Sequence, residues 1–97
     1  VLLNNGFYWN NQNSELYYKK ELLTLTKNEI LLIKTLLKNK NRFLSAEELA
    51  EIIFDDKKVE SNSIVQILSR FKNKIKKKIN NDLFFIENIY SQGYRIK

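Results

Sequence analysis

The sequence predicts an α+β domain with an N-terminal antiparallel β-sheet, a bundle of three helices and a C-terminal β-hairpin. Three patterns predict this order: aromatic β-prone segments at the start, two helix-capping motifs in the middle, and a long apolar stripe followed by further β-prone residues. The 97 residues, of which 43% are hydrophobic, can bury the modest core of one domain. We therefore expect a single domain that spans residues 1–97.

Residues 1–25 have the composition of short strands joined by turns. The aromatic residues 7–9 and the β-prone residues 16–18 flank an Asn-rich stretch at positions 10–14. Aromatic side chains favour strands, and asparagine favours turns because its amide bonds to the nearby backbone. A short antiparallel meander is therefore expected at the start of the chain.

Two capping boxes mark the starts of the first two helices. Thr26 stands three residues before Glu29, and Ser45 stands three residues before Glu48. In this spacing each side chain satisfies a backbone N–H that the first helical turn leaves unpaired. Helices are expected at about 27–38 and 46–54. Their expected buried residues are Ile30, Ile33, Leu36 and Leu37 in the first helix, and Leu49, Ile52 and Ile53 in the second.

Two connecting segments flank the second helix. Before it, Phe43 and Leu44 form either a short strand or an apolar contact with the helix that follows. After it, the segment from Asp55 to Ser61 has almost no apolar residues and is expected to be a solvated loop. The acids of this loop do not predict a metal site, because no oxygen-rich loop with a turn glycine surrounds them.

The third helix is expected at about 62–79 and is followed by a hairpin at about 83–97. The helix has one apolar stripe at helical spacing, and its opposite side is polar. The hairpin is expected to pair the apolar residues 83–86 with residues 94–96, and Gly93 can supply an unusual backbone conformation between them. The residues of the apolar stripe are Ile64, Leu68, Phe71, Ile75 and Ile79.

The net charge of +6 is concentrated in the third helix. Residues 61–80 contain six basic side chains and no acid, whereas the other 77 residues balance eleven bases with eleven acids. A general bias toward lysine would instead scatter bases among acids. Positive charge that is concentrated on one helix attracts a polyanion, so nucleic acid is the first partner to consider.

The chain contains neither histidine nor cysteine. This absence removes the imidazole base, the thiolate nucleophile and the commonest zinc ligands. We therefore expect no enzymatic activity, no cofactor and no metal. No run approaches the roughly 20 apolar residues of a membrane-spanning helix, and no secretory signal is visible, so the cytoplasm is the expected location.

Two helices, a loop and a longer basic helix followed by a hairpin form the layout of a winged helix-turn-helix. Four motifs in this order resemble the effector domains of OmpR/PhoB-type response regulators. Leu25-Thr26-Lys27-Asn28-Glu29 is similar to the family's Leu-Thr-x-x-Glu start of helix one, and Ser45 with Leu49 to its Ser-x-x-x-Leu start of helix two. The pattern from Ile64 to Ile75 resembles its recognition helix, and Gly93-Tyr94-Arg95 its wing ending.

The resemblance implies a four-stranded N-terminal sheet and a transcription regulator of the two-component class. It also implies a longer protein with a receiver domain upstream, and double-stranded DNA as the partner of a homodimer. Helix three would enter the major groove, the wing would lie alongside, and the loop from Asp55 to Ser61 would face RNA polymerase. Trp9, Tyr17 and Tyr18 would either face the receiver or pack in the core, and core packing is favoured.

The chain departs from the family at several positions that face DNA. Asn62 and Ser63 replace the frequent Arg or Thr, Ile67 replaces a frequent His, and the wing has Tyr90 and Ser91 in place of Arg and Gly. Base preference therefore does not follow from the resemblance.

The predicted DNA-binding residues have three roles. Basic side chains meet phosphates, amide and hydroxyl side chains of the helix reach base edges, and the wing tip contacts phosphate or the minor groove. Val65 can touch a thymine methyl, but packing at the core edge is favoured. The alternative function is a winged-helix module that docks an acidic protein. The predicted site residues are Asn62, Ser63, Gln66, Ser69, Arg70, Lys72, Asn73, Lys74, Lys76, Lys77, Tyr90, Ser91 and Gln92.

Overall fold

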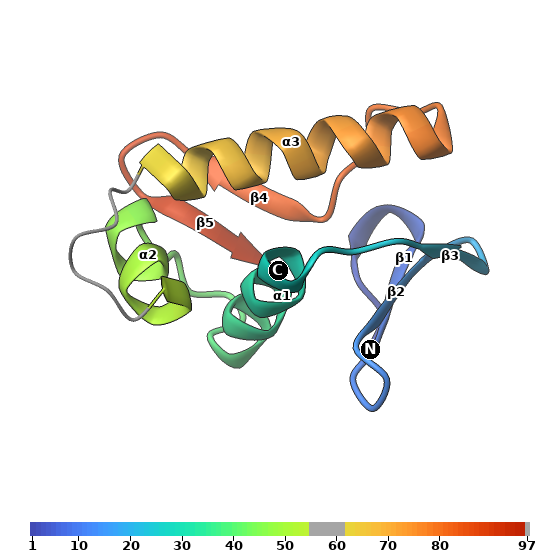
Figure 1. The fold of residues 1–97 in the computed structure, drawn as a ribbon, viewed down its shortest axis with the longest axis horizontal. Helices are drawn as coiled ribbons and strands as arrows, with labels where there is room; N and C mark the ends of the chain where they lie inside the picture. Colours follow the sequence, from blue (N-terminus) through green and yellow to red (C-terminus); the bar gives the residue numbers. More distant parts are fainter. Residues whose placement is uncertain (55–61, 97) are drawn as a thin grey trace.

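The computed structural model describes residues 1–54 and 62–96 (Figure 1). Its N-terminal antiparallel sheet, three helices and C-terminal hairpin confirm the predicted α+β winged helix-turn-helix. The three helices have the bounds expected from the sequence. The loop 55–61, with its expected polymerase contact and its acids, lies outside the described residues. The elements are η1 (Asn4–Gly6), β1 (Phe7–Asn10), β2 (Glu15–Tyr18), β3 (Glu21–Leu23), α1 (Lys27–Lys38), α2 (Ala46–Phe54), α3 (Asn62–Ile79), β4 (Ile86–Ile89) and β5 (Gly93–Ile96).

The N-terminal sheet has the order β1-β2-β3, with both neighbouring pairs antiparallel. Because side chains alternate between the faces of a strand, Trp9 and Tyr18 point into the core, as favoured from the sequence. Tyr17 lies on the opposite face, where its ring is 6.4 Å from that of its cross-strand partner Tyr8. Core packing was therefore the wrong expectation for Tyr17.

The fourth strand implied by the family resemblance is reduced to a bridge between Leu2 and Tyr8. The backbone N–H of Leu3 donates to the carbonyl of Phe7 over 2.9 Å, so the first residues do run beside β1. Directly after them, Asn5 and Gly6 have φ values of 63° and 88° and reverse the chain. This turn separates the first residues from β1.

The capping box at the start of α1 is confirmed. The Glu29 carboxylate accepts from the Thr26 backbone N–H over 2.9 Å, and the Thr26 hydroxyl accepts from the Glu29 N–H over 3.2 Å. The helix buries Leu32, Ile33 and Leu36, while the expected core residues Ile30 and Leu37 pack at its edge.

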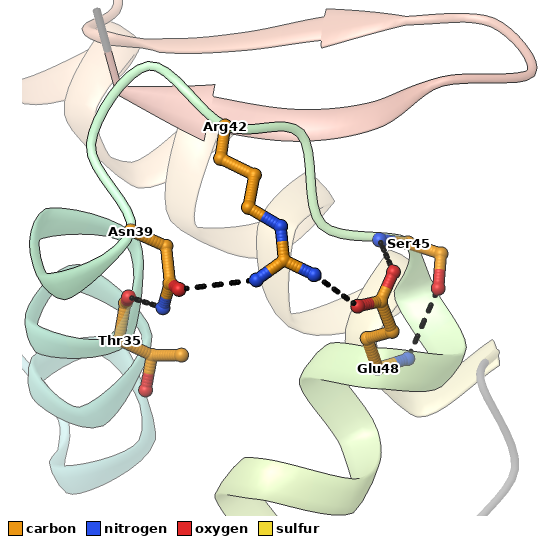
Figure 2. Close-up of polar contacts among 5 residues, drawn as sticks. All are labelled: Thr35, Asn39, Arg42, Ser45 and Glu48. Carbon is orange, nitrogen blue, oxygen red and sulfur yellow. Dashed lines mark hydrogen bonds and ion pairs between the residues drawn. The ribbon is translucent and has the colours of Figure 1, made fainter.

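The turn between α1 and α2 is held by a chain of side-chain hydrogen bonds (Figure 2). The Asn39 amide donates to the Thr35 carbonyl over 2.9 Å, and the Arg42 guanidinium donates over 3.4 Å both to Asn39 and to Glu48. Glu48 also completes the predicted capping box with Ser45, at 3.2 and 3.1 Å. The network ties the end of α1 to the start of α2.

The buried face of α2 differs from the expected one. Leu49 and Ala50 are buried, whereas Ile52 is 54% exposed. At about 100° per residue, Ile53 falls between Leu49 and Ala50, and Ile52 falls roughly a quarter turn away from this face. The expectation that Ile52 is buried was therefore wrong.

The wing pairs β4 with β5, and β4 begins later than the sequence suggested. Its first residue is Ile86, while Phe84 and Phe85 pack their rings against Phe71 of α3 at 5.3 and 6.0 Å. Phe85 also lies 5.1 Å from Phe7 of β1. The residues expected in a strand therefore form an aromatic contact that joins the sheet, α3 and the wing.

The segment before α2 takes the strand alternative. Leu44 and Tyr94 exchange two backbone hydrogen bonds of 2.9 Å, so Leu44 extends the wing by one bridge. Gly93 adopts a φ of 116°, and a Cβ at this position would lie 2.3 Å from the Leu44 carbonyl oxygen. Close approach of these two backbones therefore requires glycine.

Replacing Gly93 with alanine is expected to lower the free energy of unfolding by about 1–3 kcal/mol or more. Alanine is strained at this φ, and its Cβ would also clash with the Leu44 carbonyl oxygen. Chemical denaturation measures the change. Gly6→Ala is the matched control, since Gly6 has a φ of 88° but only side-chain atoms at 3.4 Å or beyond. Equal losses in the two variants would contradict the role of the Leu44 contact.

Candidate nucleic-acid interface

The rotation of α3 about its axis is set by four buried residues. Ile64, Leu68, Phe71 and Ile75 face the core, as the apolar periodicity predicted, and Ile79 packs at the edge. In Figure 1, α3 runs along the top of the molecule, with the other helices and the wing below it. The side of α3 opposite these four residues is consequently turned outward.

That outward side carries an uncharged polar row, here called the neutral stripe. Each of its members stands two residues before one of the four buried residues, which places it about 200° around the helix. All members are exposed. The neutral stripe consists of Asn62, Gln66, Ser69 and Asn73.

Basic side chains line both sides of the neutral stripe. Helical geometry places Lys72 and Lys76 on one side and Arg70 and Lys77 on the other, and all four are exposed. These four residues are called the basic flanks. A helix with hydrogen-bonding groups in the middle and positive charge at the sides matches the base edges and the two phosphate backbones of a groove.

The tertiary structure brings acids to three of the six bases in α3. Lys76 lies 3.7 Å from Asp82, Lys78 lies 3.2 Å from Glu21 of β3, and Lys74 contacts Glu29 of α1. The first two pairs are solvent-exposed, so each contributes little to stability. Within residues 1–54 and 62–96, no carboxylate pairs with the other three bases, Arg70, Lys72 and Lys77.

Lys74, which the sequence predicted to meet a phosphate, is half-buried and pairs within the domain. Its ammonium lies 2.5 Å from Oε1 of Glu29, the same oxygen that accepts from the Thr26 N–H. Glu29 is only 5% exposed, and a buried carboxylate without a cation would be costly. Lys74 therefore joins α3 to the start of α1, while its phosphate contact stays a prediction.

The wing tip is fully accessible. Tyr90 is 96% exposed, and Ser91 and Gln92 are exposed beside it. Ser91 has a φ of 68°, a left-handed conformation that explains why the family resemblance places glycine here. In Figure 1 the β4–β5 turn lies at the α2 end of the molecule, where α3 begins.

The base of the wing is held by charge and aromatic contacts. Arg95 donates to Glu87 over 2.9 Å, and its guanidinium lies 4.3 Å from the centre of the Phe43 ring. Burial raises the pKa of the Tyr94 phenol, and the Glu47 carboxylate of α2 raises it further, so this phenol stays neutral at physiological pH. Arg95 thus stabilises the base of the wing.

Val65 is the residue on this surface whose exposure the sequence did not reveal. It is 44% exposed, whereas packing at the core edge was favoured. Ser63 and Ile67 are half-buried, and Ile67 packs against the core. The helical angle was the available signal, since Val65 lies about a quarter turn from the buried residues and Ile67 lies closer to them.

Among residues 1–54 and 62–96, no three His, Cys, Asp or Glu side chains are grouped as metal ligands would be. None of the helices described there combines the length and apolar character needed to cross a bilayer.

Replacing Lys74 with methionine is expected to lower the free energy of unfolding by about 1–3 kcal/mol, because the buried Glu29 carboxylate loses its charged donor while the apolar stem is kept. Chemical denaturation measures this change. Lys77→Met, on an exposed flank, is the control and should alter stability by no more than about 0.5 kcal/mol. Equal stabilities of the two variants would contradict a structural role for Lys74.

Solved structures with the same fold include three regulatory proteins. The DNA-binding domain of the response regulator AdeR, in complex with an intercistronic region, has a TM-score of 0.75 and 18% identity over 99% of this chain and 98% of that chain. The Klebsiella pneumoniae RstA DNA-binding domain, in complex with the RstA box, has a TM-score of 0.75 and 12% identity, over 99% of this chain and 94% of that chain. A streptococcal redox sensor, of a family described as evolved from two-component response regulators, has a TM-score of 0.78 and 18% identity over 100% of this chain and 43% of that chain.

A comparison with curated proteins returned no significant match. The family model described as "Transcriptional regulatory protein, C terminal" matches residues 19–96, which include α1, α2, α3 and the wing. With the winged helix-turn-helix fold and the four sequence motifs, this match shows that the chain belongs to the family of C-terminal effector domains of OmpR/PhoB-type transcription regulators.

Proposed function

We propose that this domain binds double-stranded DNA sequence-specifically, with α3 in the major groove and the β4–β5 wing alongside. The observation that carries the proposal is the neutral stripe between the basic flanks. An α-helix fits the major groove, where hydrogen-bonding side chains distinguish base pairs. The flanks then lie toward the phosphates, where positive charge supplies affinity independent of sequence.

Family membership and the DNA complexes of two relatives support this proposal. AdeR and RstA share the fold and were solved on DNA, and the matched family is one of transcriptional regulators. The proposed role is transcriptional control in the cytoplasm, without catalysis. In this role the domain is one part of a two-component regulator that binds as a homodimer, and the loop after α2 is the segment proposed to meet RNA polymerase.

A receiver domain upstream of the sheet is part of this proposal. The outer face of the sheet presents an apolar row in which Leu2 pairs with Tyr8, Tyr8 with Tyr17, and Tyr17 with Leu22. Leu2, Tyr8 and Leu22 are all exposed. Contiguous exposed apolar side chains favour a protein contact, and the receiver is the partner proposed for this face.

Binding to duplex DNA is expected to weaken steeply with salt, by about 0.9 decades per decade of salt for each phosphate neutralised. Arg70→Ala, Lys72→Ala and Lys77→Ala should each reduce that slope by about one. Titration of labelled duplex by fluorescence anisotropy at several salt concentrations measures the slope.

Lys34→Ala is the control for this titration. Lys34 is exposed on α1 and lies beside Leu31 and Lys38, away from the outward side of α3, so its loss should leave the slope unchanged. A slope near zero for the unaltered protein would overturn the DNA proposal. Binding to an acidic protein that still depends on Arg70 would then favour the interaction-module alternative.

A further inference from the structure

We infer that α3 recognises an A·T-rich major-groove sequence, with Val65 contacting a thymine methyl and the amides of Asn62 and Gln66 pairing with adenine. The inference rests on the proposed DNA binding and names the class of DNA site. It follows from how charge, amides and exposed apolar surface are divided along α3.

The two halves of α3 differ in charge. Residues 62–69 contain no charged side chain, and all six bases follow from Arg70 onward. In helix-turn-helix proteins the N-terminal residues of the recognition helix contact base edges. The part of α3 placed to read bases is therefore uncharged, while the basic part follows where the helix meets phosphates.

Amide side chains match adenine in the major groove. Adenine presents one acceptor and one donor there, and an amide offers the complementary donor and acceptor. Asn62 and Gln66 are both exposed and stand four residues apart, so they lie on one side of the helix. They form the first half of the neutral stripe.

Val65 supplies the apolar part of the recognition surface. It is 44% exposed and lies on the same helical side as Asn62 and Ser69, three residues before and four residues after it. The thymine methyl is the distinctive apolar group of the major-groove edge. Because valine has one strongly preferred rotamer in a helix, it presents a fixed surface to that methyl.

Guanine is poorly matched by the same surface. Guanine presents two acceptors and is usually read by the paired donors of Arg or Lys, neither of which occurs in residues 62–69. Arg70 is the only arginine of α3, and it lies on a basic flank. Lys74, the base nearest to it on that side of the helix, is bound to Glu29.

Selection from a random duplex pool tests the predicted DNA class. The protein is incubated with the pool over several rounds, and the enriched duplexes are sequenced. We expect a repeated half-site whose central positions are mostly A·T pairs. Enriched half-sites dominated by G·C pairs would overturn the inference but leave the proposed DNA binding intact. No enrichment, together with a salt slope near zero, would overturn both.

Removal of single methyl groups tests the role of Val65. Each thymine of a selected duplex is replaced in turn by deoxyuridine, which lacks only the methyl. We expect about a fourfold loss of affinity at one position for the unaltered protein, as for one buried methyl group, and no loss at that position for Val65→Ala. The same response to deoxyuridine at every position in both proteins would overturn the contact.

Two variants complete this experiment. Ile52→Ala removes an exposed aliphatic side chain from α2, so it should keep the response of the unaltered protein to deoxyuridine. Gln66→Ala should lower the preference for adenine at one position by roughly tenfold. Thermal unfolding of each variant shows that the domain is still folded, and an unchanged base preference in Gln66→Ala would overturn the adenine contact.

Discussion

The burial of Ile64, Leu68, Phe71 and Ile75 determines which side of α3 faces solvent, and the proposed interface depends on that rotation. Each large apolar side chain stabilises its buried position by about 1.5–3 kcal/mol. A rotation of α3 by a quarter turn would expose several of them at once. The same packing that stabilises the helix bundle therefore orients the neutral stripe and the basic flanks outward, although none of those residues needs to contribute to stability.

Charge has two separate roles in α3. Lys74 compensates the buried Glu29 carboxylate and joins residues that are 45 positions apart in sequence. Arg70 and Lys77 lie on the exposed flank and have no such partner among the described residues. A lysine that pairs with a buried carboxylate contributes to folding, whereas an exposed lysine without such a partner remains available to a phosphate. Counting bases along the helix overstates the charge that faces a ligand, because some of it is neutralised within the domain.

The aromatic contact among Phe7, Phe71, Phe84 and Phe85 connects the elements around α3. Phe85 touches both the N-terminal sheet and α3, and it directly precedes the first wing strand. At the other end of the wing, the Leu44 bridge and Gly93 hold β5 against the segment before α2. The wing is thus fixed relative to α3 at both ends, so the helix and the hairpin can meet a duplex as one surface.

Local patterns in the sequence determined the helices, because the capping boxes at Thr26 and Ser45 and the apolar period of α3 involve residues within a few positions of one another. Four motifs in order also determined the family. Only the tertiary structure decided the partner of Lys74, the exposure of Val65, the outer placement of Tyr17 and the late start of β4. These features depend on contacts between segments that are distant in sequence. Because such contacts compete for the same side chains, they cannot be derived from the spacing of residues along a single element.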